Sequence, residues 1–335
     1  MIKRLFGTTS NGKEVYAYTL DNGVISVTVL SLGATVQSLV FNGRDVTLGY
    51  DTVKEYEQND GYVGAVLGRY AGIISDASFR INGKKYGLYA NSGRDTLNGG
   101  HNGFDKAIWN LKSYSGNSVS LTYYSHDGEE GFPSNLLVTM TYYVDGAIFG
   151  MECSAVSDGD TPVNIVNNVY FNLYREGVID DQFLTIYADK YNPIAKNLAP
   201  TGEIAFVKDT PFDFTLVKRI GRDIDVDDEQ IYLASGYNHN FIINGNGYRK
   251  FAEVSSPKSG VKMTGYTDNF GVGFYTGNLL TLRKGKGNNV IDRRGGFCLT
   301  TQNFPNAVNQ RHFPDPLLKN GQLYRTITEY KFEKY

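Results

Sequence analysis

Short runs of β-forming residues recur along the chain and are separated by glycine, asparagine and aspartate. Residues 24–32 read Val-Ile-Ser-Val-Thr-Val-Leu-Ser-Leu, where apolar and hydroxyl residues mostly alternate, and 34–40 and 118–124 follow the same style. Residues 136–144 are similarly rich in β-formers. A period of two is typical of half-buried strands, whereas helical periodicity is scarce. The pattern therefore predicts an antiparallel β-sandwich or barrel.

Asn-Gly pairs, which readily supply the positive φ angles of type I′ hairpin turns, punctuate these runs. No linker, low-complexity tract or short repeat interrupts the chain, so we expect one domain over residues 1–335 and disfavour a propeller. The acidic run 223–229 is expected to be a solvated surface loop. Among other places, the Asn-Gly pairs stand at Asn11-Gly12, Asn22-Gly23, Asn42-Gly43, Asn82-Gly83 and Asn320-Gly321.

Charge and composition narrow the classes of partner. Lys plus Arg number 33 against 35 Asp plus Glu, and the net charge is -2. Without a basic excess to neutralise phosphates, nucleic acid is not expected as a partner. Aromatic residues make up 13% of the chain, with 25 Tyr and 19 Phe. Strand packing accounts for most of these tyrosines, although tyrosine also suits sugar surfaces.

Two cysteines, Cys153 and Cys298, provide no disulfide framework, and no Cys/His cluster indicates a metal site. The first residues turn polar after the sixth position and lack the apolar run of a signal peptide. No apolar stretch approaches the roughly 18 residues of a membrane span. The sequence therefore predicts a cytoplasmic protein without a membrane partner or a metal.

Several short motifs follow one another over nearly the whole chain, and in this order they resemble the aldose 1-epimerase family, also called galactose mutarotases. The resemblance implies an all-β fold, a large antiparallel β-sandwich of the galactose mutarotase type. It also implies an open cleft for a hexopyranose, a small-molecule carbohydrate as partner, no cofactor, and a monomer or homodimer. The motifs lie at 68–71, 79–84, 97–100, 103–106, 109, 127–133, 161–164, 170–173, 200–204, 210–214, 236–241, 275–278, 301–302 and 304–305.

The reaction of this family interconverts the two anomers of a free sugar. A general base takes the proton of the anomeric hydroxyl, and a general acid protonates the ring oxygen, so that the ring opens and recloses on the other face. Both groups must titrate near the working pH and lie within hydrogen-bond reach. In the family a Glu is the base and a His the acid, while a second His, an Arg and an Asp hold the sugar.

Comparison of the motifs indicates that all five of these positions differ here. The family's Leu-His-Gly-Gly resembles 97–100, which puts Asn98 in place of a histidine. Asn-His-x-Tyr-Phe-Asn resembles 167–172, so the acid is replaced by Asn168, and Glu-Thr-Gln resembles 300–302, so the base is replaced by Thr300. Asp-His-Asn-Phe and Ala-Asn-Arg-Ile likewise correspond to stretches with Asn238 and Ile73. Carboxamides and a lone hydroxyl have no useful proton affinity at neutral pH.

A surviving histidine is a poor substitute for the lost groups. His101 is the best candidate, but it lies three residues after Asn98, which is about 10 Å in extended chain, whereas catalytic geometry tolerates about 0.5 Å. A surface loop is the favoured position for His101. His239 is expected to support its neighbours, and Asp105 is expected to make a fold-supporting hydrogen bond.

The favoured hypothesis is a non-catalytic or strongly impaired carbohydrate binder. Three alternatives stay open: a wet groove that binds nothing, an active aldose 1-epimerase that works through bound water, and another isomerase-type or lyase reaction on a modified sugar. Tyr70, Tyr170, His101 or Asp105 would carry the protons of that last reaction. Asn168 and Thr300 occupy the catalytic positions, and the expected sugar-binding residues are Asn98, Asn238, Ile73, Gln302, Tyr170, Phe274 and His101, with Tyr70 as a further stacking candidate.

Overall fold

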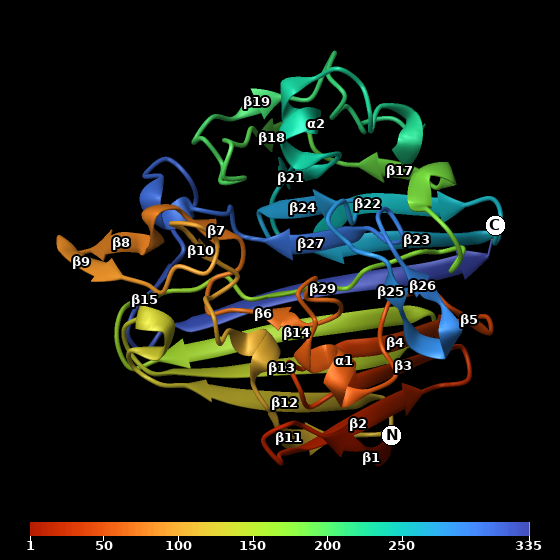
Figure 1. Cartoon of the computed structure of the whole chain (residues 1–335), viewed down its shortest axis with the longest axis horizontal. Coiled ribbons are helices and arrows are strands. Elements are labelled where there is room, and N and C mark those ends of the chain that lie inside the picture. The colour runs from red at the N-terminus through yellow and green to blue at the C-terminus, as the bar shows by residue number, and fades with distance from the viewer. Residues whose placement is uncertain (335) are drawn as a thin grey trace.

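The computed structural model describes residues 1–334, which form three larger antiparallel sheets and five two-stranded pairs (Figure 1). The nine-stranded sheet has the order β11 (Asn110–Tyr114), β12 (Ser118–Ser125), β13 (Leu136–Asp145), β14 (Ile148–Ser157), β29 (Leu323–Lys334), β23 (Val261–Thr267), β22 (Arg249–Ser256), β17 (Phe183–Ile186) and β20 (Lys218–Arg219). One five-stranded sheet consists of β1 (Ile2–Thr8), β2 (Glu14–Asp21), β3 (Ile25–Leu30), β4 (Val36–Phe41) and β5 (Arg44–Asp45).

The other five-stranded sheet has the order β19 (Ala205–Phe206), β18 (Lys190–Asn192), β21 (Asn238–Ile242), β24 (Gly271–Tyr275) and β27 (Cys298–Gln302). Short pairs join distant segments: β7 (Ile73–Ile74) with β10 (Thr96–Leu97), β6 (Val66–Leu67) with β16 (Val166–Asn167), β8 (Ser78–Ile81) with β9 (Lys84–Gly87), β15 (Thr161–Pro162) with β28 (Leu317–Leu318), and β25 (Arg283–Lys284) with β26 (Val290–Ile291). The predicted all-β antiparallel sandwich is confirmed.

Alternation of apolar and polar residues produces the long strands, as expected. Along β13 the side chains at 136, 138, 140, 142 and 144 are buried. The runs predicted at 24–32, 34–40, 118–124 and 136–144 correspond to β3, β4, β12 and β13. Strand formation here follows directly from the need to bury one face of each pleated segment.

Two of the five Asn-Gly pairs form the predicted turn with both residues at positive φ. They are Asn42-Gly43, between β4 and β5, and Asn82-Gly83, between β8 and β9. In the pairs at 11–12, 22–23 and 320–321 only the glycine has a positive φ, so the type I′ prediction is wrong for them. The loops around these three pairs differ in length and need only one left-handed residue.

Two short α-helices, α1 (Val53–Glu57) and α2 (Glu229–Ala234), interrupt the strands of the described chain. Thr52 and Glu55 form a capping box at α1. The side chain of Asp228 accepts hydrogen bonds from the backbone N–H groups of Gln230 and Ile231 at the start of α2. The acidic run at 223–229 is therefore only partly a loop, because its last residues cap and begin a helix.

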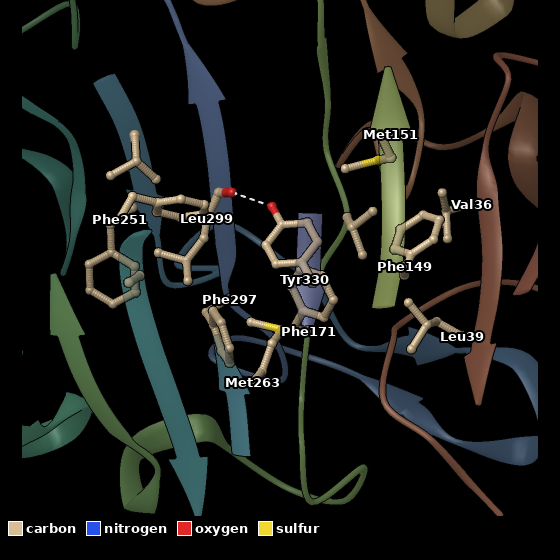
Figure 2. Packing of buried hydrophobic residues seen from close by; sticks show 14 of the residues in the cluster. Val36, Leu39, Phe149, Met151, Phe171, Phe251, Met263, Phe297, Leu299 and Tyr330 are labelled. Atoms are coloured by element: carbon tan, nitrogen blue, oxygen red, sulfur yellow. Dashed lines mark hydrogen bonds between the residues drawn. The ribbon is translucent and has the colours of Figure 1, made fainter. Parts of the chain in front are cut away.

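The core lies between the nine-stranded sheet and the two five-stranded sheets. Figure 2 shows Val36 and Leu39 of β4 beside Phe149 and Met151 of β14. Further along the same cluster, the Tyr330 hydroxyl of β29 donates a hydrogen bond of 2.7 Å to the Leu299 carbonyl of β27 (Figure 2). This layer fixes the second five-stranded sheet, whose other face carries the candidate site. Over residues 1–334, no helix has both the length and the apolar character needed to span a membrane.

Candidate functional site

A cavity of about 390 Å³, which we call the cleft, is floored by β21, β24 and β27. Its volume lies in the range of ~300–1,000 Å³ that is usual for small-molecule sites. Strand register sets Asn240 opposite Gly273 and Gly273 opposite Thr300. Side chains alternate along a strand, so one set of positions in these three strands faces the cleft. The remaining walls come from within 50–62, 67–73, 92–98, 166–170, 194–200 and 279–283 and from Pro305.

Gly273 keeps the centre of this floor open. A Cβ atom at this position would lie 3.0 Å from Nε2 of Gln302, which is closer than normal packing allows. The missing side chain therefore leaves room for the amide of Gln302 beside those of its neighbours. Gly273 lies between the polar residues Asn240 and Thr300 of the two neighbouring strands. A glycine at such a position allows a ligand to come close to the backbone.

Asn168 and Thr300 lie in contact although they are 132 positions apart in the chain. The Thr300 hydroxyl donates to the Asn168 side-chain oxygen at 3.4 Å, and the Asn168 side-chain nitrogen donates to the Tyr62 carbonyl at 3.2 Å. Asn168 follows β16, and Thr300 is in the middle of β27. The two positions expected for the proton carriers are therefore neighbours in the lining of the cleft, occupied by an amide and a hydroxyl.

Asn98 occupies a tight turn after β10 and has a φ of 51°. Asparagine tolerates this left-handed conformation better than most residues. Its side-chain oxygen accepts the Gly72 N–H at 2.9 Å, and its backbone N–H donates to the Gly72 carbonyl at 2.9 Å. Because the oxygen is engaged, the side chain of Asn98 offers the cleft its NH₂ donors.

A chain of three carboxamides orients Gln302. The Gln302 NH₂ donates to the Asn240 side-chain oxygen at 3.0 Å, and the Asn240 NH₂ donates to the Asn192 side-chain oxygen at 2.8 Å. The chain ends where the Asn192 NH₂ donates to the Glu203 carbonyl at 3.1 Å. Each amide thus fixes the orientation of the next, and Gln302 presents its oxygen as an acceptor. Asn192 and Asn240 are buried and act as positioning residues.

Three further residues of the predicted site also line the cleft. Asn238 begins β21 and is half-buried, Ile73 is buried at 7% exposure in β7, and Tyr170 is buried beside Asn168. The Tyr170 hydroxyl donates to the Gly61 carbonyl at 2.9 Å, so this phenol is already engaged in a structural hydrogen bond.

Phe274, His101 and Tyr70, which were predicted to contact a sugar, do not line the cleft. Phe274 has no exposed surface, because it projects from β24 into the core while Gly273 and Tyr275 face the cleft. His101 is exposed in a loop, where its ring nitrogen contacts the Ala90 carbonyl at 2.9 Å. Tyr70 is fully buried and donates to the Phe304 carbonyl.

Tyr62, Tyr275 and Leu198 also line the cleft, although the sequence did not predict them as site residues. Tyr62 and Leu198 are bulky residues with φ angles of 53° and 65°, a conformation that costs free energy and depends on the surrounding loop. The turn-forming residues before Tyr62 predict a loop there, but no sequence signal predicts that Tyr62 lines a cleft. Alternate residues of β24 point to opposite faces, and its sequence does not show that Tyr275 is on the face toward the cleft.

Burial shifts the pKa values of ionisable side chains in and beside the cleft away from pH 7. Burial raises the pKa of Tyr275 to about 12 and that of Tyr62 to about 12, where the nearby Asp105 carboxylate adds to the effect. His239 packs against Phe212 on the core side of β21, and burial lowers its pKa to about 3. Asp60 and Arg283 form an ion pair of 2.9 Å at the rim. Neither tyrosine nor His239 can exchange protons readily near pH 7.

Asp105, an alternative proton carrier, lies close to the cleft but does not line it. Burial raises the pKa of this carboxyl to about 6.

No set of three His, Cys, Asp or Glu side chains within residues 1–334 is grouped to hold a metal ion.

Comparison with known proteins agrees with this fold. The sequence model of the aldose 1-epimerase family matches residues 16–331. The galactose mutarotase of Sus scrofa is 40% identical over 341 residues, covering 98% of both chains, and that of Homo sapiens is 39% identical over 333 residues, covering 96% of this chain and 95% of its own. The chain therefore belongs to the aldose 1-epimerase family.

Solved structures show the same architecture. A galactose 1-epimerase from Lactobacillus acidophilus NCFM superposes with a TM-score of 0.90 at 28% identity, covering 99% of this chain and 98% of that one. An aldose epimerase homologue from C. elegans gives a TM-score of 0.89 at 27% identity, covering 95% and 98% of the two chains. The likeness extends over the whole sandwich and includes the strands that floor the cleft.

Proposed function

We propose that this member of the aldose 1-epimerase family is a carbohydrate binder whose cleft holds a hexopyranose without catalysing anomer exchange. The observation that carries the proposal is the contact between Asn168 and Thr300. These residues stand where the family resemblance puts the acid and the base, and they lie side by side in the lining of the cleft. An amide and an alcohol cannot take and return a proton near pH 7, so both proton-transfer contributions, each about 10²–10⁴-fold in rate, are lost.

Retention of a binding site is supported by the backbone of the cleft. Tyr62, Asn98 and Leu198 all have positive φ angles, and all three line the cavity. Such conformations persist where the surrounding structure holds them in place, and they concentrate at functional sites. The amides of Asn98 and Gln302, with opposite polarity toward the cavity, suit the hydroxyl groups of a sugar.

Polarimetry tests the catalytic part of the proposal. Freshly dissolved α-galactose and α-glucose are followed to equilibrium with and without micromolar protein. We expect the same rate in both cases. A rate clearly above the spontaneous one refutes the non-catalytic assignment and favours an active mutarotase.

Binding is tested separately by calorimetry with the same two sugars. We expect saturable heat that is weakened when Gln302→Leu removes the acceptor in the floor. If no monosaccharide binds, the proposal is refuted and the cleft is a groove that binds nothing.

A gain-of-function variant gives the sharpest check on the lost proton carriers. The combined changes Asn98→His, Asn168→His and Thr300→Glu reintroduce two imidazoles and a carboxylate at the cleft. We expect measurable acceleration of mutarotation in this variant and none in the parent.

The matched control places the same residue types outside the cleft. Asn110→His, Asn246→His and Thr8→Glu alter three exposed positions and are expected to give no acceleration. Equal activity of both triple variants would show that solution catalysis by added imidazole, and not the cleft, is responsible.

A further inference from the structure

One side of the cleft is apolar. Leu67, Ala71 and Val166 form a buried cluster against which the half-buried Tyr62 packs, and Ile73 continues it along β7. Strand pairing brings two of these residues together, because Val166 of β16 pairs with Leu67 of β6. We call Leu67, Ala71, Ile73 and Val166 the apolar wall.

Most polar groups of the cleft lie elsewhere, although Asn98 borders the apolar wall through its hydrogen bonds with Gly72. Asn238, Thr300 and Gln302 project from the β21, β24 and β27 sheet, with Gln302 presenting its oxygen. Asn168 links the two regions, because it follows Val166 by two residues and contacts Thr300. A ligand in the cavity therefore meets hydrogen-bonding groups on the sheet side and hydrocarbon on the side of the apolar wall.

Charge is confined to the mouth of the cleft. Within residues 1–334, the charged side chains that line the cavity are Asp60 and Arg283, which neutralise one another at 2.9 Å. A phosphate or carboxylate on the ligand would enter this interior without a free cation and would lose its hydration. The cleft therefore favours an uncharged ligand.

We propose, on the basis of the function proposed above, that the preferred ligand is a neutral pyranose carrying an apolar substituent that packs on the apolar wall. Two sources share this chemistry: the methyl group of a deoxyhexose, and the alkyl group of a glycoside. A free hexose directs a hydroxyl or a hydroxymethyl group at these four side chains, which themselves offer it no hydrogen bond. Each buried CH₂ or CH₃ group is expected to tighten binding about fourfold.

Calorimetric titration with matched sugars tests this inference and separates the two sources. The probes are galactose, 6-deoxygalactose, and the methyl and propyl galactopyranosides of both anomers, together with the corresponding glucose series. We expect at least one substituted probe to bind about fourfold or more tightly than its parent hexose, and galactose 6-phosphate to bind more weakly. A gain with the deoxy sugar identifies the methyl group as the source, and a gain that grows from methyl to propyl identifies the glycoside.

Variants of the apolar wall locate the effect. Val166→Thr preserves the shape of the side chain and places a hydroxyl in the wall, so the gain, taken as the ratio of the two affinities measured on the variant itself, should fall below twofold. Ile73→Thr serves as a second variant if the first does not fold. Val290→Thr, an exposed residue of β26 outside the cleft, is the matched control and should retain the full gain.

The outcomes distinguish this inference from the function on which it rests. Binding of the parent hexoses with no gain for any substituted probe overturns the inference alone. A gain that survives both wall variants also overturns it, because the contact then lies elsewhere. Failure of every neutral sugar to bind overturns the proposed function and this inference together.

Discussion

Replacing Asp105 by Asn should stabilise the protein at neutral pH. Asp105 lies in a short 3-10 turn beside the cleft, and burial raises the pKa of its carboxyl to about 6 from the ordinary 3.8. Folding therefore opposes the charged form of this group. The two pKa values differ by about 2 pH units, which corresponds to ~3 kcal/mol at about 1.4 kcal/mol per unit. Solvent reaches part of the side chain, so we expect ~2 kcal/mol.

The sign of the pH dependence follows from proton binding. Between pH 3.8 and about 6 the folded state holds the Asp105 proton more tightly than the unfolded state, so wild-type stability falls as pH rises through this window. Below it the carboxyl is neutral in both states, and above it the full penalty is present. Asp105→Asn removes the titration, so its advantage should be near zero at pH 3.5 and ~2 kcal/mol at pH 7.5.

Urea denaturation at several pH values, followed by circular dichroism, measures this difference. Asp145→Asn, at an exposed end of β13, is the control and should change stability by less than about 0.5 kcal/mol at every pH. A difference between Asp105→Asn and wild type that stays constant with pH would refute the reasoning. Loss of stability on substitution would instead show that the carboxylate makes a necessary hydrogen bond.

Substitutions at three further buried residues test how their side chains contribute to the fold and the cleft. Phe274→Ala should lower the free energy of unfolding by ~3–5 kcal/mol, while Phe274→Leu should leave sugar affinity unchanged in calorimetry; a selective loss of affinity would contradict its position in the core. Asn192→Leu should cost ~1–3 kcal/mol, because Asn240 loses its acceptor, and should weaken sugar binding; unchanged thermal stability and affinity would show that the carboxamide chain is dispensable. Lys286→Met should cost ~3–5 kcal/mol in urea denaturation, because the buried Lys286 amine lies 2.9 Å from the Asp45 carboxylate; a neutral result would mean that water solvates this carboxylate.

Prediction from sequence was strongest where local pattern and tertiary burial agree. The segment that forms β13 is rich in β-forming residues, and every second side chain from 136 to 144 is buried, so the local sequence is enough to predict a strand. It was weakest where a strand is apolar on both faces. In β24, Phe274 faces the core and Tyr275 faces the cleft, and a shift of one residue would exchange them. The sequence does not specify which face is inside.

The sequence alone indicates which chemical groups are present at the expected site positions. Which hydrogen bonds these groups make depends on residues that are distant in the chain. The motifs around Asn98, Asn168 and Thr300 indicate that titratable groups are absent, because the chemistry of an amide or a hydroxyl is the same in any fold. Only the tertiary structure brings Asn168 and Thr300 into contact across 132 positions, and only the buried chain through Asn192 and Asn240 turns the oxygen of Gln302 toward the cavity. Hydrogen-bond polarity is a property of neighbours in space, and no local pattern records which neighbours those are.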